Sequence, residues 1–499
     1  MPIRKEPCLK EMIQQRYREK ILRLFDEWLI PLESVQDARQ YIWKCTLDDI
    51  SSKCYQLNEY FSELPSHQQI NIISEILPKV FRELALSSIN CAIFIGDPVI
   101  LKDLSAIRQT ILDTLLIPCI EEFDLAYCDK FALEVVTNCL HKFPNSTSLP
   151  MGLEYKISNL QNLKKIINPI TCTKLTLKNV SIYCNGLKFL DVQSSKQLND
   201  TCVDYIILLQ NLEFLNIKEC CISASSYRRI LKTLPKLKNI SWHSPVDDVI
   251  TNLPKEYSER ILNADITALN ISILIEKLRN LIELSITVMR EENLSSLVEL
   301  THLNTFKVKN CHFVDSYMNN FFEKSGLKLK VLEMGDIKNA NLSAILRNCS
   351  NLKYLCLYSC DINLETVDKK EEMMSHFLNL RILKLNSNAY KGFFHPFIYF
   401  YRNLKVFHAD RTEKINDKFV NVTLEFEGFR NLEEFVVSYC PLSITTAHAL
   451  INSCPNIKFL GCLENWYSIS DIDFVEIRNR IRRENMALKL LKNTEEWFS

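Results

Sequence analysis

The stretch NLKYLCLYSCDI, residues 351 to 362, contains four apolar positions whose spacing recurs throughout the chain. Leu352, Leu355, Leu357 and Cys360 form the pattern LxxLxLxxC. Full copies of the pattern read IEEFDLAYC from residue 120, LEFLNIKEC from residue 212, LNTFKVKNC from residue 303 and LEEFVVSYC from residue 432. A copy from residue 380 ends in asparagine, and weaker copies start near residues 172, 187, 237, 266, 281, 329, 404 and 457. The sequence is therefore an array of internal repeats.

The period of the array identifies the kind of repeat. Successive copies between Leu281 and Ile457 start 22 to 28 residues apart, within the period of about 20 to 29 residues of leucine-rich repeats. Alternating leucines in x-L-x-L predict a short strand that buries every second side chain, and the chain then returns on the outer side. The predicted fold class is α/β: a leucine-rich-repeat solenoid with a curved parallel sheet and helices or turns on its convex side.

The repeat frame also explains most of the nineteen cysteines. A small side chain at the last motif position is expected to lie beneath the strand, against backbone polar atoms of the adjoining repeat. This position is taken by Cys128, Cys220, Cys311, Cys360 and Cys440. Cys349 and Cys454 recur three residues before a strand leucine, which is another interior position. These cysteines are predicted to be structural, with a reactive thiol or a metal site as the alternative.

Two further cysteine features bear on metal binding. Cys356 stands between the two strand leucines and is expected to face outward, so it points away from Cys360. No CxxC pair occurs anywhere in the chain, which removes the strongest zinc and redox signals. The adjacent Cys220 and Cys221 are interpreted as one core residue beside one surface residue. No metal and no cofactor are therefore expected.

Composition and motifs exclude several functional classes. Lys plus Arg and Asp plus Glu both number 60, so the chain has no excess charge for nucleic acid or anionic lipid. Eight glycines are present, without a GxxxxGK[ST] or GxGxxG motif, which argues against nucleotide-dependent enzymes. HExxH and GxSxG motifs are also absent, and solenoids seldom form the enclosed pocket that catalysis needs. We expect a protein that is not an enzyme.

The two ends of the chain do not follow the repeat. Residues 1–115 show helical periodicity and predict a small all-helical domain before a solenoid at residues 116–468. Ser470, followed by Asp473, has the spacing of a capping box and predicts a helix that closes the array within residues 469–499. Insertions are expected at residues 244–260 and 361–377. The chain shows no secretory signal and no apolar run long enough to cross a membrane, so a cytoplasmic or nuclear location is expected.

The cysteine-containing repeat, with CSNL or CPNI before the next strand, resembles the leucine-rich repeats of F-box and related ubiquitin-ligase substrate receptors. The resemblance covers residues 117–465 and implies that the amino-terminal helices bind a cullin adaptor. The F-box-like residues of FSELPSHQQINIISEIL are Leu64, Pro65, Ile70, Ile73 and Leu77. A rival match is to the elongin-binding box and cullin box, carried by Ile50, Cys54 and Leu57 followed by Leu64 and Pro65. An ordinary helical cap on the solenoid is the third interpretation.

This resemblance implies a non-catalytic substrate receptor of a cullin-type ubiquitin ligase. Outward positions beside the strand leucines are the candidates to hold a protein substrate on the concave face: Lys307, Lys309, Glu333, Tyr354, Tyr358, Lys384, His408 and Asp410. Tyrosines among charged residues are typical of binding hot spots. The alternative function is a leucine-rich-repeat scaffold or signalling adaptor unconnected with ubiquitin transfer. Neither function involves nucleic acid or a membrane.

Overall fold

The structure is a computed structural model that describes residues 46–62 and most of residues 163–491. Its gaps in the latter range are residues 171, 269, 289–293, 312–314, 364–378, 392–401 and 487, and scattered positions are described within residues 16–25, 64–76 and 106–124. The chain divides into two compact units, Met1–Ser241 and Trp242–Ser499. Each unit is described by itself below.

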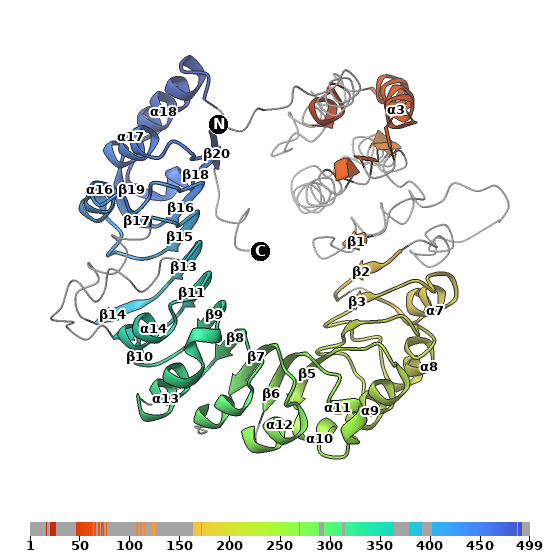
Figure 1. The fold of residues 1–499 in the computed structure, drawn as a ribbon. Helices are drawn as coiled ribbons and strands as arrows, with labels where there is room; N and C mark the ends of the chain where they lie inside the picture. The colour runs from red at the N-terminus through yellow and green to blue at the C-terminus, as the bar shows by residue number, and fades with distance from the viewer. Residues whose placement is uncertain are drawn as a thin grey trace, which may run out of the picture. The chain divides into compact units, whose positions relative to one another are not determined.

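The first unit contains a helical part followed by the first repeats. Its longest described helix buries one face and leaves the other exposed. Four short strands pair in parallel and in chain order, with a helix or turn after each of the last three (Figure 1). The strands are β1 Glu122–Asp124, β2 Lys165–Ile167, β3 Phe189–Asp191 and β4 Phe214–Asn216, and the helices are α3 Leu47–Ser62, α7 Lys174–Tyr183, η4 Asp200–Cys202, α8 Val203–Ile206 and α9 Ala224–Thr233.

The second unit is built on an 11-stranded sheet whose strands follow one another in chain order. Its neighbouring strands β6 to β20 pair in parallel. The strands are β5 Asn239–Pro245, β6 Asn263–Ala268, β7 Glu283–Val288, β8 Thr305–Lys309, β9 Val331–Gly335, β11 Tyr354–Tyr358, β13 Ile382–Asn386, β15 Val406–Asp410, β16 Glu434–Ser438, β18 Phe459–Gly461 and β20 Lys489–Leu491. The predicted leucine-rich-repeat architecture is confirmed.

The helices of this unit lie on one side of its sheet (Figure 1). They are α10 Asp247–Ile250, α11 Lys255–Ser258, α12 Ile271–Lys277, η5 Leu294–Glu299, α13 Asp315–Ser325, η6 Gly326–Lys328, α14 Leu342–Asn348, α16 Asp417–Glu425, α17 Ile444–Ser453, η7 Leu463–Asn465 and α18 Asp471–Arg483. Leu352, Leu355 and Leu357 are buried, as the repeat pattern predicts. The core therefore lies between the sheet and its helices.

Short strands also form just after the motif. A three-stranded parallel sheet joins β10 Ala340–Asn341, β12 Asp361–Asn363 and β14 Ala389–Lys391, and a second pair joins β17 Cys440–Ser443 and β19 Trp466–Ser468. The expected insertion at residues 361–377 is thus wrong at its start, because β12 pairs in register with both neighbours. The expected insertion at residues 244–260 is also wrong, since α10 and α11 supply buried Val249, Ile250 and Ser258 to an ordinary repeat.

A left-handed residue precedes the last motif position in nine described repeats. Its φ lies between 48° and 68° at Ile170, Ser194, Glu219, Asn310, Asp336, Ser359, Ser387, Arg411 and Tyr439. Such backbone costs a non-glycine residue about 1 kcal/mol. In eight of these repeats the N–H donates to a carbonyl oxygen of the next repeat at 2.7 to 3.0 Å, for example from Ser194 to Lys218 and from Asp336 to Tyr358. These bonds extend the parallel ladder and offset the cost.

The side chain at the last motif position bonds to the preceding repeat. The Cys220 thiol lies 3.2 Å from the Val192 carbonyl oxygen, and the Cys360 thiol lies 3.4 Å from that of Met334. Burial raises the pKa of each of these thiols to about 11, so both are protonated at neutral pH. The structural interpretation is confirmed for the buried cysteines at these positions, Cys220, Cys360 and Cys440, and for Cys349 and Cys454. Cys311 is only partly buried, and Cys128 lies outside the described residues.

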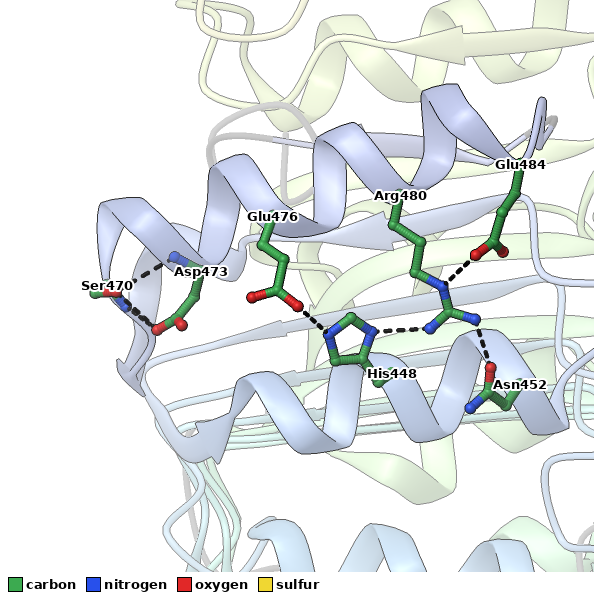
Figure 2. Close-up of polar contacts among 7 residues, drawn as sticks. All are labelled: His448, Asn452, Ser470, Asp473, Glu476, Arg480 and Glu484. Carbon is green, nitrogen blue, oxygen red and sulfur yellow. Dashed lines mark hydrogen bonds and ion pairs between the residues drawn. The ribbon is translucent and has the colours of Figure 1, made fainter.

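The carboxyl-terminal helix α18 has the predicted capping box. The Ser470 hydroxyl accepts from the Asp473 N–H, and the Asp473 carboxylate accepts from the Ser470 N–H. α18 packs beside α17 (Figure 2). The sheet does not end at this helix, because β20 follows it and pairs with β18.

Arg480 on α18 makes two hydrogen bonds to α17 and one to the end of its own helix. Arg480 donates to Nδ1 of His448 at 2.8 Å, to Asn452 at 2.5 Å and to Glu484 at 3.0 Å (Figure 2). A guanidinium can only donate, so Nδ1 accepts and the imidazole proton is on Nε2. Nε2 then donates to Glu476 at 3.3 Å.

Candidate protein-binding surface

The face of the second unit's sheet opposite the helices, called here the inner face, carries three rows of side chains. The strand register aligns one residue per strand in each row. The first row contains Thr305, Val331, Tyr354, Ile382, Val406 and Glu434. The central row contains Lys307, Glu333, Cys356, Lys384, His408 and Val436, and the third contains Lys309, Gly335, Tyr358, Asn386, Asp410 and Ser438. Buried leucine, phenylalanine and related residues alternate with the rows and face the core.

All eight predicted substrate-binding residues lie in these rows. Lys307, Glu333, Lys384 and His408 are in the central row, Tyr354 is in the first, and Lys309, Tyr358 and Asp410 are in the third. Seven of them are at least partly exposed. The register thus brings together residues that lie up to about a hundred positions apart in the sequence. Their role in binding stays a prediction.

Tyr358 has a fixed place in the third row. Its ring lies over Gly335 of the neighbouring strand, where any Cβ would collide with the ring carbons. On the next strand, Lys309 Nζ lies 5.4 Å from the ring centroid, within the range of a cation–π contact. Sequence reasoning missed Gly335, although a strand glycine in a glycine-poor chain is a recognised sign of close approach. The result is a rigid aromatic surface between two repeats.

Cys356 lies in the outward row, as expected, but its residue is only 7% exposed. Glu333 and Lys384 flank it in the register, and Tyr354 hydrogen-bonds to it. Burial raises the pKa of the Cys356 thiol to about 11 and also raises the pKa of Tyr354. Cys356 is therefore a protonated thiol at neutral pH and a poor nucleophile.

His408 differs from the expectation of an accessible side chain. It is 1% exposed, and its Nε2 lies 3.5 Å from the Glu434 carboxylate. In the central row it stands between Lys384 and Val436, so neighbouring side chains surround it. Burial lowers its pKa below 6.5, and the imidazole is neutral at pH 7. His408 supports the face from within and cannot contact a ligand without rearrangement.

Two of the five predicted adaptor-binding residues are buried in the first unit. Leu64 and Ile73 are buried and Pro65 is half-buried, whereas Ile70 and Leu77 lie outside the described residues. The rival elongin-box residues Ile50, Cys54 and Leu57 are likewise buried on α3. The exposed face of α3 carries Tyr55, which is 69% exposed. Leu64, Ile73 and the three elongin-box residues thus pack inside the unit, and the surface that α3 offers lies on its other face.

Within the described part of the chain, no group of three or more histidine, cysteine, aspartate or glutamate residues has the arrangement of a metal site. None of the described helices is long and apolar enough to cross a membrane.

Comparison with known proteins adds little to this picture. No protein-family model and no curated protein matches the sequence. Among solved structures, similarity is found to an internalin from Listeria monocytogenes (18% identity, 68% of this chain and 83% of that chain, TM-score 0.32). Others are a leucine-rich-repeat protein of Leptospira interrogans (14%, 76% and 91%, 0.37) and the Rad7 and Elc1 complex of yeast (14%, 68% and 84%, 0.39). The protein is a leucine-rich-repeat solenoid by its own repeats, sheet and register.

Proposed function

We propose that this protein is a non-catalytic protein-interaction subunit whose inner face binds a partner protein. The observation that carries the proposal is the in-register set of two tyrosines and several charged residues on one face. Tyr358 is held over Gly335 and beside Lys309, so its ring loses little freedom on binding. Preorganised aromatic residues among charges are the usual hot spots of protein interfaces.

The more specific proposal is a substrate receptor of a cullin-type ubiquitin ligase. It is supported by the sequence resemblance and by the order of parts, a helical region ahead of a solenoid. Holding adaptor and substrate on one chain would make ubiquitin transfer effectively intramolecular. Because Leu64 and Ile73 are buried, the exposed face of α3 around Tyr55 is the better candidate surface. The alternative is a scaffold or signalling adaptor without a link to ubiquitin.

Adaptor binding is tested with the purified full-length chain and purified F-box-type and elongin-type adaptors. Alanine at Leu64 or Ile73 would disturb the core, so Tyr55→Glu is the informative variant. Tyr467→Glu is the matched control, because Tyr467 is 62% exposed on β19 of the other unit. The receptor proposal expects one adaptor to bind the native chain and the Tyr467 variant, and to bind the Tyr55 variant at least about tenfold more weakly. If a folded, monodisperse chain binds neither adaptor, the scaffold function remains.

Partner binding at the inner face is tested separately by crosslinking in cells. The double variant Tyr354→Ala, Tyr358→Ala should lose the proteins captured by the native chain, while an adaptor bound at the helical region should stay. The Tyr467→Glu variant again serves as control. Capture that is unchanged by the double variant would place the binding surface elsewhere.

A further inference from the structure

A separate row of residues lies where the strands of the second unit begin. It consists of the residue that follows the first motif leucine in six successive repeats: Lys330, Lys353, Arg381, Lys405, Glu433 and Lys458. After Lys330, the N–H of each member donates to the carbonyl oxygen of the preceding member at 2.7 to 2.9 Å. The hydrogen bonds fix one residue per repeat at the strand spacing of about 4.8 Å. We call this set the edge row.

The acidic member neutralises only one end of the edge row. Glu433 pairs with Lys405 and, at 2.6 Å, with Lys458, and these hydrogen bonds lower the pKa of its carboxyl. Lys330, Lys353 and Arg381 stand side by side at the other end, and no carboxylate among the described residues lies within ion-pair distance of them. Like charges on neighbouring strands destabilise a sheet.

In the first unit, the charged side chains at the same motif position neutralise one another. There the corresponding residues are Lys188, Glu213 and Lys238, and Glu213 contacts the two lysines at 3.1 and 3.3 Å. The first unit thus places an anion between two cations, whereas the second unit places four cations in succession before Glu433, which pairs with only the last of these four, Lys405. The second unit has room for an external anion at this edge.

A groove beside the edge row provides the matching shape. It measures about 570 Å³ and is lined by Lys353, Arg381, Lys405 and the Glu433 that pairs with Lys405, together with asparagines from four successive repeats. These asparagines directly precede the first motif leucine, so they also form a register. Asn431 donates through Nδ2 to the Arg402 carbonyl oxygen at 2.8 Å. An amide held through its nitrogen keeps its oxygen as an acceptor for a peptide N–H.

We propose that this groove binds a short, extended, acidic segment of a partner protein. Side chains on one side of an extended peptide lie about 7 Å apart, which lysine and arginine side chains on neighbouring repeats can both reach. The planar guanidinium of Arg381 can hold one carboxylate through two hydrogen bonds. Lys353 holds a second carboxylate, and the asparagine series receives the peptide backbone. Binding here is independent of the proposed function of the inner face.

A peptide fits this groove better than a nucleic acid does. Nucleic-acid binding depends on neutralising many phosphates. The edge row has four successive cations, the last of them paired with Glu433, and the Glu433 carboxylate would repel a continuing phosphate backbone. The chain as a whole is also neutral, with 60 basic and 60 acidic residues, and so exerts no long-range attraction on a polyanion.

The test measures fluorescence anisotropy with a labelled peptide of sequence Gly-Glu-Ser-Glu-Ser-Glu-Gly and the full-length chain. The double variant Lys353→Gln, Arg381→Gln should weaken peptide binding at least about tenfold. The control double variant Lys232→Gln, Lys418→Gln changes exposed helix lysines and should bind like the native chain. Arg381→Lys should bind with intermediate affinity, because lysine cannot form the two-bond contact.

Four further probes test whether the ligand is an acidic peptide. The peptide with glutamine in place of glutamate should not bind, and added salt should weaken binding of the acidic form. If a phosphoserine peptide alone binds, and the double variant abolishes its binding, the site is confirmed and phosphate is identified as its anion. Equal binding of the glutamine peptide, no effect of the double variant, or tighter binding of a ten-nucleotide thymidine strand than of the peptide would overturn the proposal.

Discussion

Replacing Asn388 with alanine should destabilise the second unit by about 2 to 4 kcal/mol. Asn388 takes the last motif position and is 8% exposed. Its Oδ1 accepts from the Cys360 N–H at 2.9 Å, and its Nδ2 donates to the Leu357 carbonyl oxygen at 2.8 Å. Alanine removes these two hydrogen bonds, which are worth about 1 kcal/mol each. It also leaves the buried Cys360 N–H and Leu357 carbonyl oxygen without these bonds, at a further cost of about 1 kcal/mol or more.

The assay is thermal denaturation followed by circular dichroism. A loss of this size should lower Tm by roughly 5 to 10 °C for a unit of this length. Because each repeat packs only on its neighbours, a split transition would locate the weakened junction between two repeats. Asn388→Cys should recover part of the loss, since cysteine serves at this position in other repeats and its thiol can donate to the carbonyl. Exposed Asn379→Ala is the control, and an N388A variant that melts within about 1 °C of the native chain would refute the reasoning.

Burial holds the pKa of His408 below 6.5, so at mildly acidic pH the unfolded chain binds a proton at this residue that the folded chain does not. The free energy of unfolding should therefore fall as the pH drops below 6.5, and it should fall less steeply in the His408→Gln variant. Melting curves between pH 5 and 7.5 measure this difference, and parallel curves would contradict it. Iodoacetamide at pH 8 should alkylate exposed Cys221 while sparing Cys220, whose pKa is raised to about 11; equal labelling in peptide mass spectra would disprove the burial argument. Arg480→Ala should loosen α18 from α17, seen as faster amide hydrogen exchange in α18 with β13 unaffected, and unchanged exchange would show that the capping box and apolar contacts suffice.

The repeat pattern was enough to predict the strands and their buried residues, because side-chain alternation along a strand depends only on local sequence. It could not predict the left-handed residue before the last motif position. That position is occupied by residues as different as Ile170, Arg411 and Tyr439, none of which signals such backbone. The bond that its N–H makes to the next repeat decides its conformation, and that bond exists only after the repeats stack.

Sequence reasoning predicted correctly which residues lie on the inner face, but it did not predict that His408 is buried there. Lys384 and His408 occupy equivalent positions on adjacent strands, yet the first is partly exposed and the second is buried. His408 lies against the Glu434 side chain of the next strand, and the motif of a single repeat does not reveal such a neighbour. The amino-terminal helices gave a similar result, because apolar residues that match an adaptor box also match the inward face of a helix.

The backbone hydrogen bonds between strands set the strand register, whereas the length of the segment on the helix side differs between repeats. The repeat that starts at Leu303 is 26 residues long and the next, from Leu329, is 23, but their strands β8, β9 and β11 stay aligned residue for residue. Insertions and deletions on the helix side can therefore accumulate during evolution without moving any inner-face side chain. A protein engineer could likewise exchange one whole repeat and change only the inner-face side chains that its strand carries.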